Sequence, residues 1–308
     1  MNSKPKLSVV VSAYNEEKKI QDCLDSVNGL ADEIIVIDNQ SLDGTVAIVK
    51  KYTKHIFSRK NNLMLNINKN FGFSKASGDW ILNLDADERV SEELKSELLA
   101  LFANEIASDV SGFALPRKNI IFGKWTQHTG WYPDYHLRLF RKGKGKFAQR
   151  HVHEQLEITG KAEKLKNPLI HQHYESVAQF LQKTFFLYAP SEADVLLKNG
   201  YIFSYKDALI FPMREFLSRF FAREGYKDGF TGLMLSILMA FYHFVVFANL
   251  WEKHRYQDND LDPVLLLENQ KRDWQKDISY WVYTTKISSS VDPWQKLFLR
   301  IKKRLLSL

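Results

Sequence analysis

Two carboxylates at the end of an apolar run are the pattern in this sequence that points most directly to chemistry. Residues 80–88 read Trp-Ile-Leu-Asn-Leu-Asp-Ala-Asp-Glu. Side chains two apart on a strand point the same way, so we expect Asp85 and Asp87 to converge where the strand ends. Paired hard oxygens suit Mg²⁺ or Mn²⁺, which commonly take substrate phosphates as remaining ligands. The pattern therefore predicts a nucleoside-diphosphate site, and the alternative is an Asp-rich surface turn.

The first third of the chain is predicted to alternate between strands and helices, and these elements must position the two carboxylates. We expect strands at 7–13, 33–38, 55–58 and 80–84, and helices at 16–27, 43–52, 63–76 and 91–102. This alternation predicts an α/β fold whose mostly parallel central sheet is covered by helices on both faces. Ligands of such sheets bind beyond the carboxyl ends of the strands. Polar clusters fall at three of these ends, at 12–16, 38–41 and 85–87.

Composition narrows the class of protein. The chain has 308 residues, of which 45% are hydrophobic, which is enough for a substantial core. The single cysteine, Cys23, excludes an internal disulfide and is expected to serve packing in a reducing compartment. A net charge of +7 suits nucleic acid, an anionic membrane or phosphorylated substrates. The charge is spread along the chain without a nucleic-acid-binding motif, so a non-catalytic nucleic-acid-binding protein is the disfavoured alternative. No secretory signal is recognised at the N-terminus.

Four linked motifs carry a resemblance to a known family. They are Ser-Ala-Tyr-Asn-Glu at 12–16, Ile-Asp-Asn-Gln-Ser-Leu-Asp-Gly-Thr at 37–45, Lys-Asn-Phe-Gly at 69–72 followed by Ala-Ser-Gly-Asp-Trp at 76–80, and Leu-Asp-Ala-Asp-Glu at 84–88. Their order and spacing resemble the family-2 glycosyltransferases, which have the GT-A fold. His-Thr-Gly-Trp-Tyr-Pro-Asp at 128–134, Arg-Leu-Phe at 138–140 and Val-His-Glu at 152–154 resemble the branch that contains lipopolysaccharide-core glucosyltransferases.

The resemblance implies an inverting, metal-dependent enzyme. It would move a sugar from a nucleoside-diphosphate sugar, with a UDP-hexose favoured, to a hydroxyl of a lipid-linked or lipopolysaccharide-core saccharide. Residues 1–110 would form the nucleotide-sugar-binding half of a GT-A domain, 111–175 its acceptor-side and catalytic part, and 176–308 a helical, membrane-associating region. A close alternative is a polyprenyl-phosphate sugar synthase, whose phosphate acceptor needs no strong base.

The same resemblance assigns the donor site. The nucleotide contacts would be Ala13, Tyr14, Glu16, Asp38, Ser41, Lys69 and Asp85. The family's Asp-Asp after the second strand is Asp38-Asn39 here. Asp87 would be the direct ligand of Mg²⁺ or Mn²⁺, with Asp85 sharing the cation and His171 or His173 completing its shell. Two His pairs, His151/His153 and His171/His173, also allow a zinc site, which we disfavour because zinc needs four converging ligands.

An alcohol acceptor requires a general base on the side opposite the leaving group. Glu154 is the first candidate and Asp134 the second, and a salt-bridged strand-end residue beside Arg150 is the alternative role for Glu154. Trp125, His128, Trp131 and Tyr132 are expected to form the acceptor wall, since flat aromatic faces cover the C–H surface of a sugar. The competing interpretation is that these loop aromatics plug the core.

The C-terminal third contains two apolar segments. Residues 230–250 lack Asp, Glu, Lys and Arg and are long enough to span a bilayer, but basic residues flank both ends. Residues 294–308 combine an apolar stripe with five basic residues, which is typical of a helix that lies on an anionic membrane. We therefore predict a cytoplasmic protein held peripherally on the inner face of the cytoplasmic membrane. For 230–250 the alternatives are a buried helix or a homo-oligomer surface.

Overall fold

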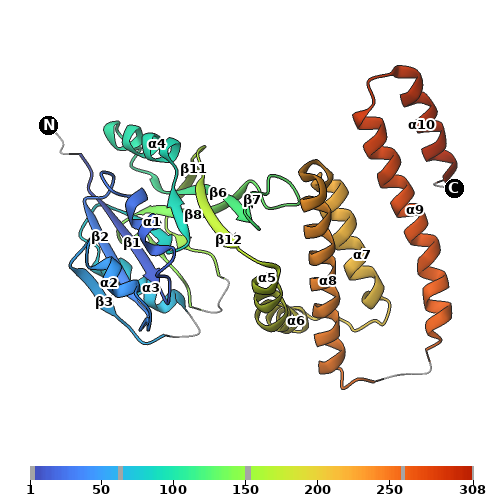
Figure 1. The fold of residues 1–308 in the computed structure, drawn as a ribbon, viewed down its shortest axis with the longest axis horizontal. Coiled ribbons are helices and arrows are strands. Elements are labelled where there is room, and N and C mark those ends of the chain that lie inside the picture. Colours follow the sequence, from blue (N-terminus) through green and yellow to red (C-terminus); the bar gives the residue numbers. More distant parts are fainter. Residues whose placement is uncertain (1–3, 62–64, 150–153, 258–260, 307–308) are drawn as a thin grey trace. The chain divides into compact units, whose positions relative to one another are not determined.

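The computed structural model describes residues 4–61, 65–149, 154–257 and 261–306. The chain divides into two compact units (Figure 1). The first comprises 1–125 and 132–173, and the second comprises 126–131 and 174–308. The chain therefore passes from one unit to the other three times, because the short segment 126–131 leaves the first unit and returns to it.

The first unit is an α/β domain. Its strands are β1 (Leu7–Ala13), β2 (Glu33–Asp38), β3 (His55–Ser58), β4 (Trp80–Asp85), β5 (Glu88–Val90), β6 (Val110–Ile121), β7 (Lys124–Trp125), β8 (Asp134–Arg141), β9 (Gly145–Lys146), β10 (Glu157–Ile158), β11 (Lys161–Lys164) and β12 (Leu169–Tyr174). Its helices are α1 (Ile20–Ser26), α2 (Thr45–Val49), α3 (Leu65–Lys75) and α4 (Glu92–Ala103). The main sheet has the order β3-β2-β1-β4-β8-β6-β12-β5, with β7 and β11 also paired to β6, and β9 pairs with β10 apart from it.

The four parallel strands occupy one half of the sheet, as predicted, in the order β3-β2-β1-β4. Ala13 on β1 lies beside Asp38 on β2, and Ser12 lies beside Asp85 on β4. The three polar clusters expected from the sequence therefore share one edge of the sheet. In the other half, β8 runs antiparallel to β4 and β6 antiparallel to β8. The α/β class with a helical C-terminal region is confirmed.

Both faces of the parallel half are covered by helices. Val9 and Val11 of β1 pack into a cluster with side chains of α1 and α4, whereas Val10 packs on the opposite face with Phe73 and Ala76. This alternation is what a strand buried on both faces requires. Ser91 begins α4 as the sequence predicts, since its hydroxyl accepts a hydrogen bond from the Leu94 N–H at 3.1 Å.

The predicted helix 16–27 is shorter in the structure, where α1 begins only at Ile20. The reason lies in the loop before it, which is bound to the β2–α2 loop. Asn15 has a φ of 55°, and its N–H donates to the Ser41 hydroxyl at 3.0 Å. The Glu16 N–H donates to Thr45 Oγ1 at 2.8 Å. These side-chain acceptors hold the loop in a conformation that differs from a helix.

The second unit is helical. Its elements are α5 (Val177–Lys183), the π-helical turn η1 (Thr184–Tyr188), α6 (Ala189–Lys198), α7 (Asp207–Leu217), the π-helical turn η2 (Ser218–Ala222), the 3₁₀ turn η3 (Gly225–Asp228), α8 (Gly229–Lys253), α9 (Pro263–Ser289) and α10 (Pro293–Leu306). Within the described part of the chain, the segment Gly225–Lys253 is long and apolar enough to cross a bilayer, and 39% of its most apolar window is buried in the fold.

The segment 126–131 is held by polar contacts inside the second unit. His128 Nδ1 lies 2.8 Å from Asp228 Oδ1, and the His128 N–H donates to Asp228 Oδ2 at 2.8 Å. Arg219 Nη1 donates to the Thr129 carbonyl at 2.7 Å, and the Thr129 N–H donates to the Arg223 carbonyl at 3.0 Å. Four hydrogen bonds thus fasten this short segment to the turns around α7 and α8.

Candidate active site

The nucleotide candidates of the first two strands lie in loops that bind each other. Ala13 is buried at the end of β1, and Tyr14 after it is 41% exposed. Asp38 is buried at the end of β2 and accepts a hydrogen bond from the Ser41 N–H at 3.1 Å. With the Asn15–Ser41 and Glu16–Thr45 bonds, these contacts fix both loops at the carboxyl edge of the sheet. A nucleotide that binds at this edge would contact two loops whose conformations are fixed by these hydrogen bonds.

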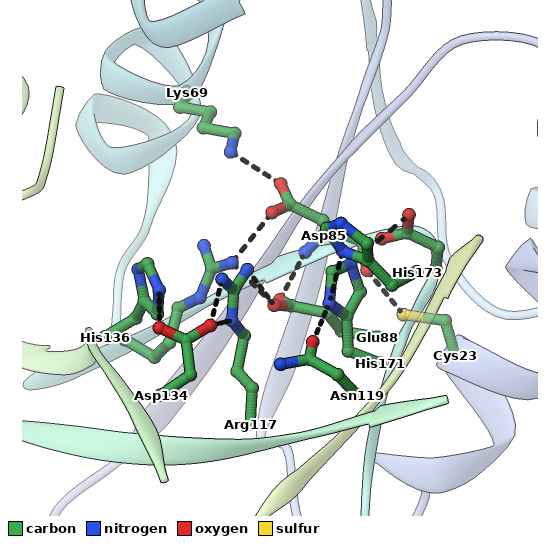
Figure 2. A network of polar contacts seen from close by, with 12 residues as sticks. Cys23, Lys69, Asp85, Glu88, Arg117, Asn119, Asp134, His136, His171 and His173 are labelled. Carbon is green, nitrogen blue, oxygen red and sulfur yellow. Dashed lines mark hydrogen bonds and ion pairs between the residues drawn. The ribbon is translucent and has the colours of Figure 1, made fainter. Parts of the chain in front are cut away.

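Asp85 ends β4 between two cations (Figure 2). Lys69 Nζ from α3 lies 2.5 Å from Oδ1, and Arg138 Nη2 from β8 donates to Oδ2 at 2.8 Å. Burial alone would raise the pKa of the Asp85 carboxyl, but Lys69 and Arg138 hold that pKa well below its usual range. Asp85 is therefore ionised, and each of its oxygens already contacts a positive charge.

Glu88 is a buried carboxylate beneath Asp85 that the sequence analysis did not single out. It is fully buried, and it accepts hydrogen bonds from the Asp85 N–H at 3.0 Å and from Arg138 Nη2 at 2.6 Å. Burial would lower the pKa of Arg138, but Glu88 and Asp85 raise it above its ordinary value. Arg117 Nη1 also lies 4.0 Å from Glu88 Oε1 and pairs with Asp134, so three carboxylates and three cations form a charge-balanced cluster around the Asp-Ala-Asp turn.

Replacement of Glu88 by Gln should weaken both this cluster and the fold. Arg138 would keep only Asp85 as a counter-charge, and breaking a buried ion pair from one side costs about 3 kcal/mol in the free energy of unfolding. Chemical denaturation measures this loss. The matched control is Glu105→Gln, which changes an exposed carboxylate of the same unit. An unfolding free energy equal for the two variants would contradict the role given to Glu88.

Asp87 lies next to a histidine that a second side chain orients. His171 Nε2 is 3.7 Å from Asp87 Oδ2, and His171 Nδ1 is 2.7 Å from Asn119 Oδ1. The contact with Asn119 places the Nδ1 proton, so a neutral His171 presents the Nε2 lone pair on the side of Asp87. His173 lies against the same ring, with its Nδ1 3.2 Å from His171 Nδ1.

These groups fit a divalent cation for which the protein would provide only some of the ligands. Asp87 would supply an oxygen and His171 a nitrogen, while the oxygens of Asp85 are engaged by Lys69 and Arg138. Across the described residues, no three His, Cys, Asp or Glu side chains gather closely enough to hold a metal ion by themselves. Mg²⁺ and Mn²⁺ suit such a site, because they are commonly bound by one or two protein ligands together with substrate phosphates and water.

The two candidate bases differ in their surroundings. Asp134 binds Arg117, whose Nε donates at 2.9 Å, and its Oδ1 lies 2.9 Å from His136 Nε2. Burial would raise the pKa of Asp134, but His136 and Arg117 lower it far below its usual range. A carboxylate stabilised in this way is a weak proton acceptor. These pairs favour a structural role for Asp134.

Glu154 is half-buried and tied to the helix that carries Lys69. Its Oε1 accepts hydrogen bonds from Asn66 Nδ2 at 3.1 Å and from the Gln149 N–H at 2.5 Å. Asn66 and Lys69 are three residues apart on α3, so they lie on one side of the helix. Glu154 thus binds α3 one helical turn away from Lys69, whose ammonium contacts Asp85. Arg150, His151 and His153 lie outside the described residues.

The four acceptor candidates are divided between the units. Trp125 and Tyr132 belong to the first, with ring centroids 5.6 Å apart in an edge-to-face contact. His128 and Trp131 belong to the second, where His128 binds Asp228 and Trp131 packs edge to face on Tyr174 at 6.3 Å. The contacts of His128 and Trp131 favour the core-plug interpretation for these two residues. Trp125, 37% exposed, keeps a surface on which a sugar could stack.

Sequence reasoning missed Glu88, Arg117, Asn119 and Arg138. The signal available was the presence of charged residues within apolar strands, since Arg117 and Arg138 interrupt β6 and β8. Cys23, taken for a packing residue, is buried in the core, and its Sγ is 3.7 Å from the Asp85 carbonyl oxygen.

Comparison with known proteins gives consistent results. The family model described as glycosyl transferase family 2 matches residues 8–157. An uncharacterized glycosyltransferase of Rickettsia typhi is 31% identical over 258 residues, which cover 80% of this chain and 87% of that protein. The lipopolysaccharide core biosynthesis glycosyltransferase LpsC of Rhizobium meliloti is 26% identical over 258 residues, covering 80% and 93%. Among solved structures, S. aureus TarS 1–349 in complex with UDP is similar, with 15% identity, coverage of 98% and 89%, and a TM-score of 0.40.

Proposed function

The chain belongs to glycosyltransferase family 2, and from this premise we propose that it transfers a hexose from a nucleoside diphosphate, UDP in the first place, to a hydroxyl of a lipid-linked or lipopolysaccharide-core saccharide. The observation that carries the proposal is the common edge formed by β2, β1 and β4. Asp38, Ala13 and Asp85 lie there on adjacent strands, and Asp87 with His171 follows directly.

The donor would lie along this edge. The β1–α1 and β2–α2 loops, with Ala13, Tyr14, Glu16, Asp38 and Ser41, would hold the nucleoside. Lys69 and Asp85 would lie near the ribose and the diphosphate, where the Lys69 ammonium also offsets phosphate charge.

Asp87 and His171, with His173 beside them, would hold a divalent cation. When bound, that cation stabilises the negative charge that develops on the departing diphosphate. Lys69 and Arg138 keep their contacts with Asp85 in this arrangement. The protein therefore keeps the Asp-Ala-Asp turn in one geometry and leaves Asp87 available for the cation.

The transfer itself would be a single displacement with inversion. The acceptor oxygen forms a bond to the anomeric carbon as the bond from that carbon to the diphosphate oxygen breaks, and the acceptor proton passes to Glu154. Glu154 is favoured over Asp134 because Arg117 and His136 stabilise the ionised Asp134. Trp125 and Tyr132 would form the first part of the acceptor wall.

The proposal that the acceptor is a lipid-linked or lipopolysaccharide-core saccharide is supported by similarity to a relative. LpsC of Rhizobium meliloti is described as a lipopolysaccharide core glycosyltransferase, and it aligns over 80% of this chain. The motifs 128–134, 138–140 and 152–154 resemble the same branch. An acceptor of this kind is built on a lipid, which agrees with a protein that works at the inner face of the cytoplasmic membrane.

Titration of the protein with a panel of nucleotide sugars in Mn²⁺ buffer tests the donor class. We expect heat of binding and a raised thermal transition with at least one UDP-hexose, because a ligand that binds only the folded state stabilises it by mass action. Chelation of the metal should remove most of this effect. If no common nucleotide sugar binds with Mn²⁺ present, the proposed function is wrong.

A further inference from the structure

Helix α10 exposes a stripe of large apolar side chains. All are at least 48% exposed, and they are Trp294, Leu297, Phe298, Ile301 and Leu305. Their spacing of three and four residues puts them on one side of the helix. Five such neighbours on one helix form a contiguous apolar surface, and this differs from the scattered exposed apolar residues of an ordinary protein surface.

The opposite side of α10 packs on α9, beside which it lies (Figure 1). Lys296, Leu299 and Lys303 are partly buried, whereas the other residues from 293 to 305 are exposed. Lys303 Nζ lies 3.7 Å from the centroid of the Tyr280 ring of α9. The amphipathic helix thus turns two lysines toward its neighbour and leaves its most apolar side uncovered. Packing within the unit does not account for the stripe.

Every charged residue of α10 is basic. The helix contains Lys296, Arg300, Lys302, Lys303 and Arg304 and no acidic residue. Over the described ranges, Lys296, Arg300, Lys302 and Lys303 form no ion pair with a carboxylate. At 100° per residue, Lys302 borders the apolar stripe on one side and Arg304 borders it on the other. The stripe is therefore framed by cations.

The apolar helix α8 differs in this respect, although it also has exposed apolar residues. Three of the basic residues around it are ion-paired: Arg219 with Glu215, Lys227 with Glu224 at 2.7 Å, and Lys253 with Asp194 at 2.7 Å. Arg223 and Arg255 form no ion pair with a described carboxylate. Unpaired positive charge around α8 is therefore lower than on α10, where at least four basic residues lack an ion pair with a described carboxylate. Attraction to an anionic surface should depend on α10 and much less on α8.

We propose that α10 docks the protein on an anionic lipid bilayer, lying in the membrane plane with the apolar stripe in the interface and the framing cations at the headgroups. A bilayer supplies both features that this side of the helix requires, an apolar layer and a negative surface. A second copy meeting through α10 would bring two sets of five positive charges together, which opposes association. The inference does not depend on the transfer reaction, so each can fail without the other.

Sedimentation with vesicles tests this docking on the full chain. We expect binding to phosphatidylcholine vesicles that contain phosphatidylglycerol, weak binding to pure phosphatidylcholine, and release at high salt. Phe298→Ser with Ile301→Ser should weaken binding by about tenfold or more, because two apolar side chains no longer enter the interface. Lys302→Gln should weaken it about fivefold.

The chain offers matched controls for both changes. Ile237→Ser with Phe244→Ser removes the same residue types from α8, where both are similarly exposed, and Lys198→Gln removes an exposed charge from α6. Binding should be retained in both. The inference is overturned if the α8 pair releases the protein and the α10 pair does not, or if vesicle binding is absent. It is also overturned if the α10 pair abolishes only self-association or binding to a DNA duplex.

Discussion

Asp87→Asn is expected to lower kcat/KM about a thousandfold. The variant loses the carboxylate charge that faces His171 Nε2 at 3.7 Å, and with it the proposed direct ligand of the cation. A neutral amide binds Mg²⁺ or Mn²⁺ poorly, so charge on the departing diphosphate would be left without compensation. Initial rates across a series of Mn²⁺ concentrations measure the loss.

Two comparisons separate this effect from a general disturbance. Asp109→Asn, at an exposed position of the same unit, should leave both rate and metal dependence unchanged. His171→Ala should raise the Mn²⁺ concentration needed for half-maximal rate, since it removes the second proposed ligand. Full activity of Asp87→Asn at the usual Mn²⁺ concentration would show that the cation is held elsewhere or is not used.

Glu154→Gln should lower kcat by about 10² to 10⁴ with little change in donor binding, as loss of a general base does. The amide keeps the shape of the side chain and an oxygen for the Asn66 and Gln149 donors, so the loop should stay in place. Steady-state rates with a saccharide acceptor, together with calorimetry of the donor, distinguish loss of chemistry from loss of binding.

The same variant separates the two acceptor classes. Glu157→Gln, three residues along and exposed, is the control and should be as active as the parent chain. If Glu154→Gln also keeps its turnover while Asp87→Asn does not, the acceptor would be a phosphate that needs no strong base. That result would favour the polyprenyl-phosphate sugar synthase over transfer to a hydroxyl.

The sequence pattern predicted the parallel half of the sheet and the edge where its polar clusters meet. Local information was sufficient there, because the i, i+2 spacing of Asp85 and Asp87 at the end of an apolar strand predicts that both carboxylates lie at the same edge of the sheet. The partners of Asp85 could not be predicted from the sequence in this way. Arg138 reaches it from β8, 53 residues away in sequence, and pairing of β8 with β4 cannot be read from either strand alone.

The C-terminal helices show the same division between local and long-range information. The amphipathic character of 294–308 is visible in the spacing of Trp294, Phe298, Ile301 and Leu305. Which side of that helix meets a neighbour depends on α9 and required the structure. Glu88 could not be identified from the sequence, where it is one more acidic residue after Asp85 and Asp87. The burial of Glu88 and its hydrogen bond from the Asp85 N–H depend on the tertiary structure.

The division of the chain has a practical consequence for anyone who wishes to isolate the nucleotide-binding unit. A stop codon after His173 would delete Arg219, Arg223 and Asp228 while retaining 126–131, whose His128 and Thr129 bind them. In the truncated polypeptide, the hydrogen-bonding groups of His128 and Thr129 would lose their partners, and 126–131 would no longer be held in place. A clean excision would therefore have to bridge Trp125 to Tyr132 with a short linker as well.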